Sequence, residues 1–313
     1  MFERLSKTVF HVVARSRALK AVASRYGMRG EGSFARRFIA GETIDEAIAA
    51  SRRVQRDGLH LTLDYLGESV ATLADTETAT RAYLAVIQAV VASGIERNLS
   101  LKLTQLGLDV DEAIAVDNLR KILESAEPQA FFIRIDMESS AYTDVTLRIF
   151  ETLWKQGHRC IGVVLQADLR RTDDDVARVN ALCGRIRLVK GAYKEPREAA
   201  YVHKEEVDEA YGRLVRLLLA QGVYPAIATH DPAMIALTRQ WAADHQVAND
   251  RFEFQMLYGI RRDLQADLVA QGYRVRVYIP FGREWFPYFM RRLGEHPANV
   301  AFVVQALFRE ERH

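Results

Sequence analysis

The sequence is poor in cysteine and in long apolar runs. Cys160 and Cys183 are the only cysteines among 313 residues, which excludes a disulfide-stapled scaffold and is typical of reduced thiols in a cytosol-like compartment. No uninterrupted apolar stretch approaches the roughly 20 residues that span a bilayer, and the N-terminus has no secretory pattern. We therefore expect a cytoplasmic protein that is neither secreted nor integral to a membrane.

An excess of one charge is also missing. Lys and Arg number 43 against 41 Asp and Glu, so composition gives no reason to expect a nucleic-acid partner. The local exception is residues 1–40, which hold nine Lys or Arg and two Glu. This segment is a basic amphipathic helix for peripheral membrane contact at an anionic inner face, an organelle-targeting sequence, or a helix that packs on the domain.

A regular alternation of two patterns begins at residue 58. Short apolar or β-branched runs alternate with longer helical patterns, which indicates repeated βα units. We expect strands at residues 59–63, 99–103, 131–135, 160–165, 186–189, 224–228, 252–256 and 275–278. Eight parallel strands with right-handed crossovers can close into a (β/α)8 TIM barrel, and an open doubly wound sheet is the alternative. We assign residues 1–57 to a helical N-terminal extension and 58–313 to the barrel and its C-terminal helix.

Local signals place several of the helices. Residues 76–93 carry their apolar side chains on one stripe, as an amphipathic helix does. Asp231 followed by Pro232 is a helix start, because aspartate caps free amides and proline suits the first helical position. The glycine-rich residues 27–32 do not follow a strand and therefore predict a turn rather than a dinucleotide site.

Polar residues cluster where the expected strands end, which is where the functional groups of such barrels lie. Lys102 alternates with two leucines near the end of the second expected strand, and Arg187 lies between apolar residues of the fifth. Either face of a closed barrel is largely covered, so both cations need anionic partners. Together with Asp136 and Lys190, they predict a shared polar pocket rather than separate structural ion pairs.

The last expected helix, residues 285–295, supplies a second set of polar groups. Tyr288, Arg291 and Glu295 share one face, and Arg292 lies one position around. Two adjacent arginines can grip a carboxylate with bidentate, charge-assisted contacts. The alternative is an exposed pair on a solvated helix.

At these positions the chain resembles the proline dehydrogenase family over roughly residues 58–305. The matching segments occur in the family's order: LDYLGE (63–68), SLKL (100–103), IDME (135–138), RLVKGAY (187–193), ATH (228–230), FEFQML (252–257) and YFMRRL (288–293). Each is short, but seven in sequence are very specific. The chain departs from the pattern at His296, where the family has arginine. We expect this difference to affect the packing of a loop or lid and to leave the arginine pair intact.

The resemblance implies a distorted TIM barrel that oxidises L-proline to Δ1-pyrroline-5-carboxylate by hydride transfer to FAD. It implies that Asp136, Arg187 and Lys102 serve catalysis. Asp136 would orient Lys102, and Arg187 would lie beside the flavin's reactive nitrogen. The residues implied for the substrate are Lys102, Tyr278, Tyr288, Arg291, Arg292, Leu257 and Glu68, with Glu68 pairing with Arg291 as a lid. Those implied for FAD are Met137, Gln166, Arg187, Lys190, Gly191, Ala192, Thr229 and His230. Electrons then pass to a quinone or another acceptor.

Three other functions remain open on the sequence. Lys102 or Lys190 suits the nucleophile of a Schiff-base aldolase, although this leaves the arginine pair unexplained. A metal-dependent hydrolase could use Asp136, His230 and Glu253, but one histidine makes a poor transition-metal site. The non-enzymatic alternative is a ligand- or membrane-binding protein with an inert barrel.

Overall fold

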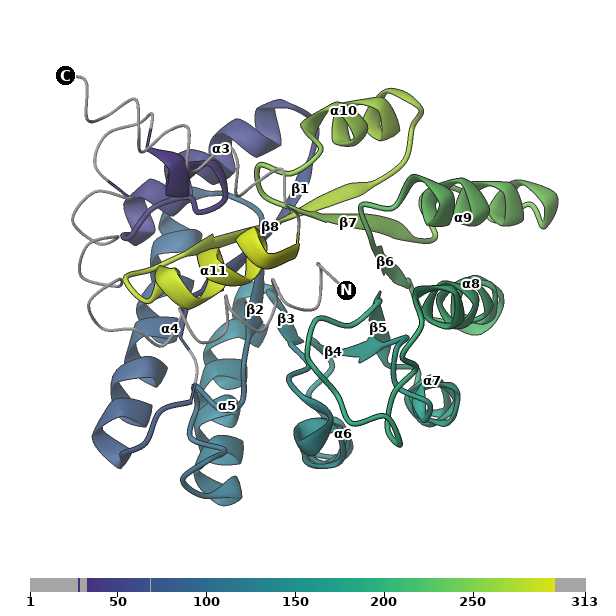
Figure 1. The fold of residues 1–313 in the computed structure, drawn as a ribbon. Coiled ribbons are helices and arrows are strands. Elements are labelled where there is room, and N and C mark those ends of the chain that lie inside the picture. Colours follow the sequence, from purple (N-terminus) through teal and green to yellow (C-terminus); the bar gives the residue numbers. More distant parts are fainter. Residues whose placement is uncertain (1–27, 29–32, 68, 296–313) are drawn as a thin grey trace.

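The fold is a closed barrel of parallel strands (Figure 1). It is seen in a computed structural model that describes Met28 and residues 33–67 and 69–295. In these residues, eight strands pair in chain order and β8 closes on β1. The strands are β1 (His60–Tyr65), β2 (Asn98–Leu101), β3 (Phe132–Ile135), β4 (Ile161–Gln166), β5 (Arg185–Val189), β6 (Ala226–Ala228), β7 (Glu253–Leu257) and β8 (Val275–Phe281). The predicted (β/α)8 barrel is confirmed and the open sheet was the wrong alternative.

The strand boundaries differ from the predicted ones by up to three residues, and two of these differences have local reasons. The sixth strand begins at Ala226 rather than at Tyr224, because Tyr224 has a φ of +48° and leaves the extended conformation. The eighth strand continues past Tyr278 to Phe281 and stays in register with β1. Pro280 lies within it, and the carbonyl of Pro280 accepts a hydrogen bond from the Ala40 N–H.

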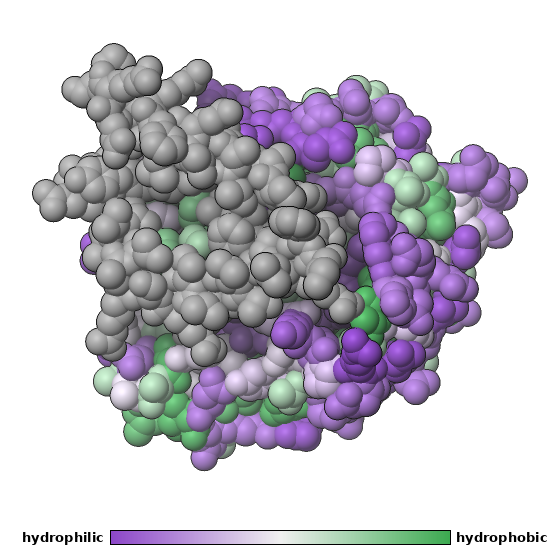
Figure 2. Space-filling model, in the orientation of Figure 1, coloured by the Kyte–Doolittle hydropathy of each residue, from purple (hydrophilic) through white to green (hydrophobic). Residues whose placement is uncertain are grey.

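Helices follow the strands, and all of them except the last, α11, cover the outside of the barrel (Figure 1). Those from the barrel region are α4 (Leu73–Ser93), α5 (Glu112–Ala126), α6 (Thr143–Lys155), α7 (Thr172–Ala181), α8 (Lys204–Gln221), α9 (Pro232–Asp244), α10 (Arg262–Ala270) and α11 (Trp285–Glu295). The predicted start of α9 is confirmed, because the Asp231 side chain accepts a hydrogen bond from the Ala233 N–H. Figure 2 shows mainly hydrophilic residues over α8, α9 and α10, as expected of helices whose apolar faces pack on strands.

The strands place apolar side chains outward and polar side chains inward. On β5, Ile186 and Leu188 belong to the hydrophobic core shared with the helices, and Arg187 alternates with them. Arg187 bonds to Ser100 on β2, which is not a neighbour of β5. Because only side chains that cross the interior can join distant strands, the centre of this barrel is polar. That interior positions the site.

The described part of the N-terminal extension packs on the barrel. Helix α3 (Ile44–Arg56) begins at a capping box formed by Thr43 and Glu46, and it contacts β1 and β8. A short 3-10 helix, η1 (Phe34–Arg37), precedes it. No helix among the described residues is both long and apolar enough to cross a membrane. The basic residues 1–27 and most of the predicted turn at 27–32 lie outside the described residues.

A separate hydrophobic cluster holds α11 near the barrel mouth. Phe38 and Ile39 from the extension pack with Trp285 and Phe289 of α11. The same cluster includes Leu66 after β1 and is contacted by Tyr278 of β8. The Trp285 indole N–H also donates to Glu42 Oε1 at 2.9 Å. Helix α11 is therefore fixed at the carboxyl-terminal end of the barrel, which is the end where function is expected.

Candidate active site

Lys102 lies directly after β2 and meets carboxylates from two neighbouring strands. Its Nζ is 3.3 Å from Asp64 Oδ1 on β1 and 3.7 Å from Asp136 Oδ2 after β3. Lys102 is 6% exposed and Asp64 is fully buried. Burial raises the pKa of Asp64 and the Lys102 ammonium opposes this increase. The anionic partner that the sequence required for Lys102 is therefore present in the protein.

Arg187 is held by three different side chains inside the barrel. It donates from Nε to Gln255 Oε1 at 2.5 Å, from one terminal nitrogen to Asp136 Oδ1 at 2.8 Å, and from the other to Ser100 Oγ at 3.1 Å. The residue is 5% exposed. With partners on every side, the plane of the guanidinium has one favoured orientation.

Tyr278 on β8 completes the cluster. Its hydroxyl donates to Asp136 Oδ2 at 2.7 Å, and the Arg187 guanidinium lies 5.4 Å from its ring centroid. Burial, followed by the negative charges of Asp136 and Asp64, raises the pKa of Tyr278 well above its ordinary value. The phenol therefore stays protonated at neutral pH and acts as a hydrogen-bond donor.

The formal charges of this cluster cancel. Lys102 and Arg187 carry two positive charges, and Asp64 and Asp136 carry two negative ones. A ligand carboxylate bound beside Lys102 would therefore need cations from elsewhere, because an uncompensated buried charge is costly.

Helix α11 carries the predicted pair of arginines. Arg291 and Arg292 are both partly buried, so the pair is not a fully solvated one. The Arg292 guanidinium lies 5.3 Å from the ring centroid of Tyr288, which is 6% exposed. Leu257 is the register partner of Tyr278, and these two predicted wall residues are therefore neighbours. Glu68, the predicted lid residue, and His296 lie outside the described residues.

Several predicted cofactor residues follow β4 and β5. Gln166 ends β4 and is 2% exposed, and its Oε1 has no hydrogen-bond partner among the described residues. Lys190 pairs with Asp208 and Asp231. Gly191 has a φ of +117°, and a Cβ there would collide with the Asp168 carboxylate. Only glycine fits this close approach of backbone to side chain.

The other predicted cofactor residues follow β3, β5 and β6. Met137 is buried after β3, and Ala192 is exposed after Gly191. Thr229 accepts a hydrogen bond from the Asp231 N–H at 3.0 Å, so it also stabilises the start of α9. His230 Nε2 accepts from the Leu257 N–H at 2.9 Å and ties the β6 end to the β7 end. All of these residues lie at the carboxyl ends of the strands.

Two residues of the cluster lie among the polar residues expected at the strand ends, but the sequence predicts no role in the site for them. Asp64 pairs with Lys102, and Gln255 binds Arg187. Both lie in the matching motifs and alternate with apolar residues on their strands, which is the signal that could have identified them. In the part of the chain that the structure describes, no group of three or more His, Cys, Asp or Glu could hold a metal ion.

The fold and the site together are those of a (β/α)8-barrel enzyme, with a charged cluster at the carboxyl ends of the strands. Residues 47–305 match the family described as "Proline dehydrogenase". The chain is 42% identical to "Proline dehydrogenase 1" of Bacillus subtilis strain 168, over 96% of this chain and 99% of that protein. It is 44% identical to "Proline dehydrogenase" of Deinococcus radiodurans, over 88% of this chain and 91% of that protein.

A solved structure supports the same assignment. Proline utilization A (PutA) from Bdellovibrio bacteriovorus, inactivated by N-propargylglycine, superposes with a TM-score of 0.78 at 26% identity. The match covers 83% of this chain and 32% of that one, so the chain spans about a third of the length of that protein. The chain belongs to the proline dehydrogenase family, and it is an oxidoreductase.

Proposed function

We propose that the chain oxidises L-proline to Δ1-pyrroline-5-carboxylate with FAD bound at the carboxyl ends of the strands. The observation that carries this proposal is the buried cluster of Lys102, Asp136, Arg187 and Tyr278. The cluster provides hydrogen-bond donors that are fixed in position. Because its formal charges cancel, it can bind the carboxylate of a substrate only if further cations lie close by. The arginine pair of α11, a helix packed at the same end, supplies them.

In this proposal, Lys102, Arg291 and Arg292 hold the substrate carboxylate, with Glu68 as a lid. Tyr278, Tyr288 and Leu257 wall the proline ring and exclude water from it. Asp136 fixes both Lys102 and Arg187, from contacts of 3.7 and 2.8 Å. With the amine neutral, its lone pair assists loss of hydride from the adjacent ring carbon, and the amine proton leaves to give the imine.

The residues after β4 to β6 fit the cofactor. Bound FAD would accept the hydride, and the chemistry of that transfer belongs to the cofactor. Met137, Gln166, Arg187, Lys190, Gly191, Ala192, Thr229 and His230 would hold it. One observation favours this assignment: the Oε1 atom of Gln166 is buried without a partner among the described residues.

The remaining parts of the proposal concern the acceptor and the domains. Electrons would pass on to a quinone or another acceptor, with the basic segment of residues 1–40 making peripheral contact with the inner face of a membrane. Residues 1–57 would form the helical extension and 58–313 the catalytic barrel. The Schiff-base alternative fits less well, because Lys102 is held by Asp64 and Asp136 whereas the nucleophile must be a neutral amine.

Purified protein tests the proposal directly. It should be yellow, and anaerobic addition of L-proline should bleach the flavin absorbance. D-Proline at the same concentration is the matched control, since the carboxylate clamp should hold its ring in the wrong orientation. Colourless protein with no affinity for FAD, or flavin that L-proline leaves oxidised, would contradict it.

A further inference from the structure

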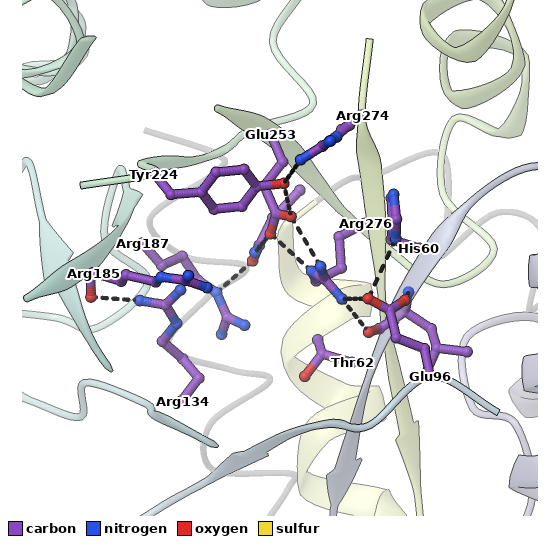
Figure 3. A network of polar contacts seen from close by, with 12 residues as sticks. His60, Thr62, Glu96, Arg134, Arg185, Arg187, Tyr224, Glu253, Arg274 and Arg276 are labelled. Carbon is purple, nitrogen blue, oxygen red and sulfur yellow. Dashed lines mark hydrogen bonds and ion pairs between the residues drawn. The ribbon is translucent and has the colours of Figure 1, made fainter. Parts of the chain in front are cut away.

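A chain of polar contacts runs from Arg187 through the barrel interior to the amino-terminal end of the strands (Figure 3). Gln255 accepts from Arg187 Nε through its Oε1 atom and donates through Nε2 to Glu253 Oε1. Arg276 binds both oxygens of Glu253, from Nε at 2.8 Å and from a terminal nitrogen at 3.0 Å. These contacts join β5, β7 and β8 in one network.

The network is anchored at its far end. Arg276 donates from its other terminal nitrogen to the Leu61 carbonyl at 2.6 Å and to Glu96 Oε1 at 2.8 Å. Glu96 in turn lies 3.3 Å from His60 Nδ1. Arg276 therefore has an acceptor for each of its three bonding nitrogens, and it cannot turn away from Glu253 without losing several charge-assisted bonds.

Burial makes this network a strong constraint. Glu253, Gln255 and Arg276 are 2%, 4% and 7% exposed. Burial raises the pKa of Glu253, but the Arg276 guanidinium outweighs it and lowers the pKa below its ordinary value. Glu253 is therefore ionised at neutral pH, and an ionised carboxylate only accepts hydrogen bonds.

The charge of Glu253 decides which way the Gln255 amide faces. Its NH2 group must face the carboxylate, so the carbonyl oxygen must face Arg187. A neutral group in place of Glu253 would allow the amide to flip, and its NH2 group would then oppose the Nε–H of Arg187. Two facing donors repel, and Arg187 would lose one of its three fixed partners.

We propose that Glu253, held by Arg276, is a positioning residue for Arg187, and that it acts from β7, two strands away from β5, through the orientation of the Gln255 amide. The inference rests on the proposed function only in placing Arg187 beside the flavin. A cation held there stabilises the added electrons of the reduced cofactor, so the orientation of Arg187 sets how readily the flavin is reduced.

The test is the reduction equilibrium of the FAD-bound protein against a redox dye. Glu253→Gln removes a negative charge, and direct electrostatics alone would make the flavin easier to reduce. The positioning role predicts the opposite sign: the equilibrium constant for reduction falls at least tenfold, which is about 30 mV for a two-electron couple. The turnover number for proline should fall more than the Michaelis constant rises, because Arg291 and Arg292 are untouched.

Tyr224→Phe is the matched control. The Tyr224 hydroxyl donates to the other oxygen of the same carboxylate, Glu253 Oε2, at 3.1 Å. Its removal leaves the Gln255 amide orientation in place, so the reduction equilibrium should stay within twofold of the unsubstituted protein. If Glu253→Gln fails to fold, Gln255→Leu removes the acceptor without a change of charge and should also lower the equilibrium constant.

The outcomes separate this inference from the proposed function. An unsubstituted protein that binds no FAD would sink the proposed function. A protein that binds FAD and is bleached by proline, but whose Glu253→Gln form has an unchanged or larger equilibrium constant, would overturn the positioning role alone. An equal fall in Tyr224→Phe would also overturn it, because the effect would then follow general disturbance around Glu253.

Discussion

Glu96 gives a quantitative prediction of how stability depends on pH. Burial raises its pKa, but the contacts with His60, Arg276 and the Leu61 N–H lower the pKa from its ordinary 4.5 to about 2. A carboxyl with a lowered folded pKa contributes stability above its unfolded pKa and loses it as pH falls toward the folded pKa. Linkage then gives a contribution of about 3 kcal/mol at neutral pH, of which about 2 kcal/mol remains at about pH 3.5.

The assay is urea unfolding of the unsubstituted protein and of Glu96→Gln at both pH values. The free energy of unfolding should be lower in the variant at neutral pH, and the difference should shrink by about 1 kcal/mol at about pH 3.5. Glu77→Gln is the control, because its side chain is 67% exposed and pairs only at the surface. A difference between Glu96→Gln and the unsubstituted protein that is the same at both pH values would show that the ionisation of Glu96 does not stabilise the fold.

Three further predictions concern the site. Arg291→Lys and Arg292→Lys should each raise the Michaelis constant for proline about tenfold or more while FAD is retained, because the bidentate grip is lost but the charge stays; an unchanged constant in steady-state titration counts against the clamp. Asp64→Asn should lower the free energy of unfolding by about 1 kcal/mol, since Lys102 loses its nearer partner at 3.3 Å but keeps Asp136 at 3.7 Å, and the cost of burying the Asp64 charge disappears; equal urea midpoints would contradict this. Gly191→Ala should destabilise the protein by about 1–3 kcal/mol through the contact with Asp168. Gly157→Ala is the control, because Gly157 has a φ of +105° but open space around it, so this variant measures only the cost of the backbone conformation. Thermal unfolding temperatures that fall equally in the two variants would show that the contact with Asp168 has no effect.

The barrel could be predicted because its strands carry a local signal. Each strand is short and apolar on its outer side, and each is followed by a helix with a recognisable stripe or cap. Strand ends were less well defined. Tyr224 is apolar enough to extend a strand pattern, but its positive φ depends on the turn before β6, and the run past Tyr278 depends on pairing with β1.

The site was predicted in part, and the missing part has a physical reason. A lysine between leucines requires an anionic partner, and this was visible at Lys102. The partner itself, Asp64, lies on another strand, and the sequence alone does not determine which side chains meet inside the barrel. The link from Arg187 through Gln255 to Glu253 needs the register of β5, β7 and β8, which only the closed barrel supplies.

The proposed function requires that the cluster around Lys102 and Arg187, together with the α11 arginines, form one flavin-dependent proline site. Anaerobic titration of the FAD-bound protein with L-proline, followed by flavin absorbance, tests it most directly. We expect stoichiometric FAD, full bleaching by L-proline, and a shift of the titration to much higher proline concentration in Arg291→Lys and Arg292→Lys. Protein without flavin, or titration curves that coincide for all three proteins, would contradict it.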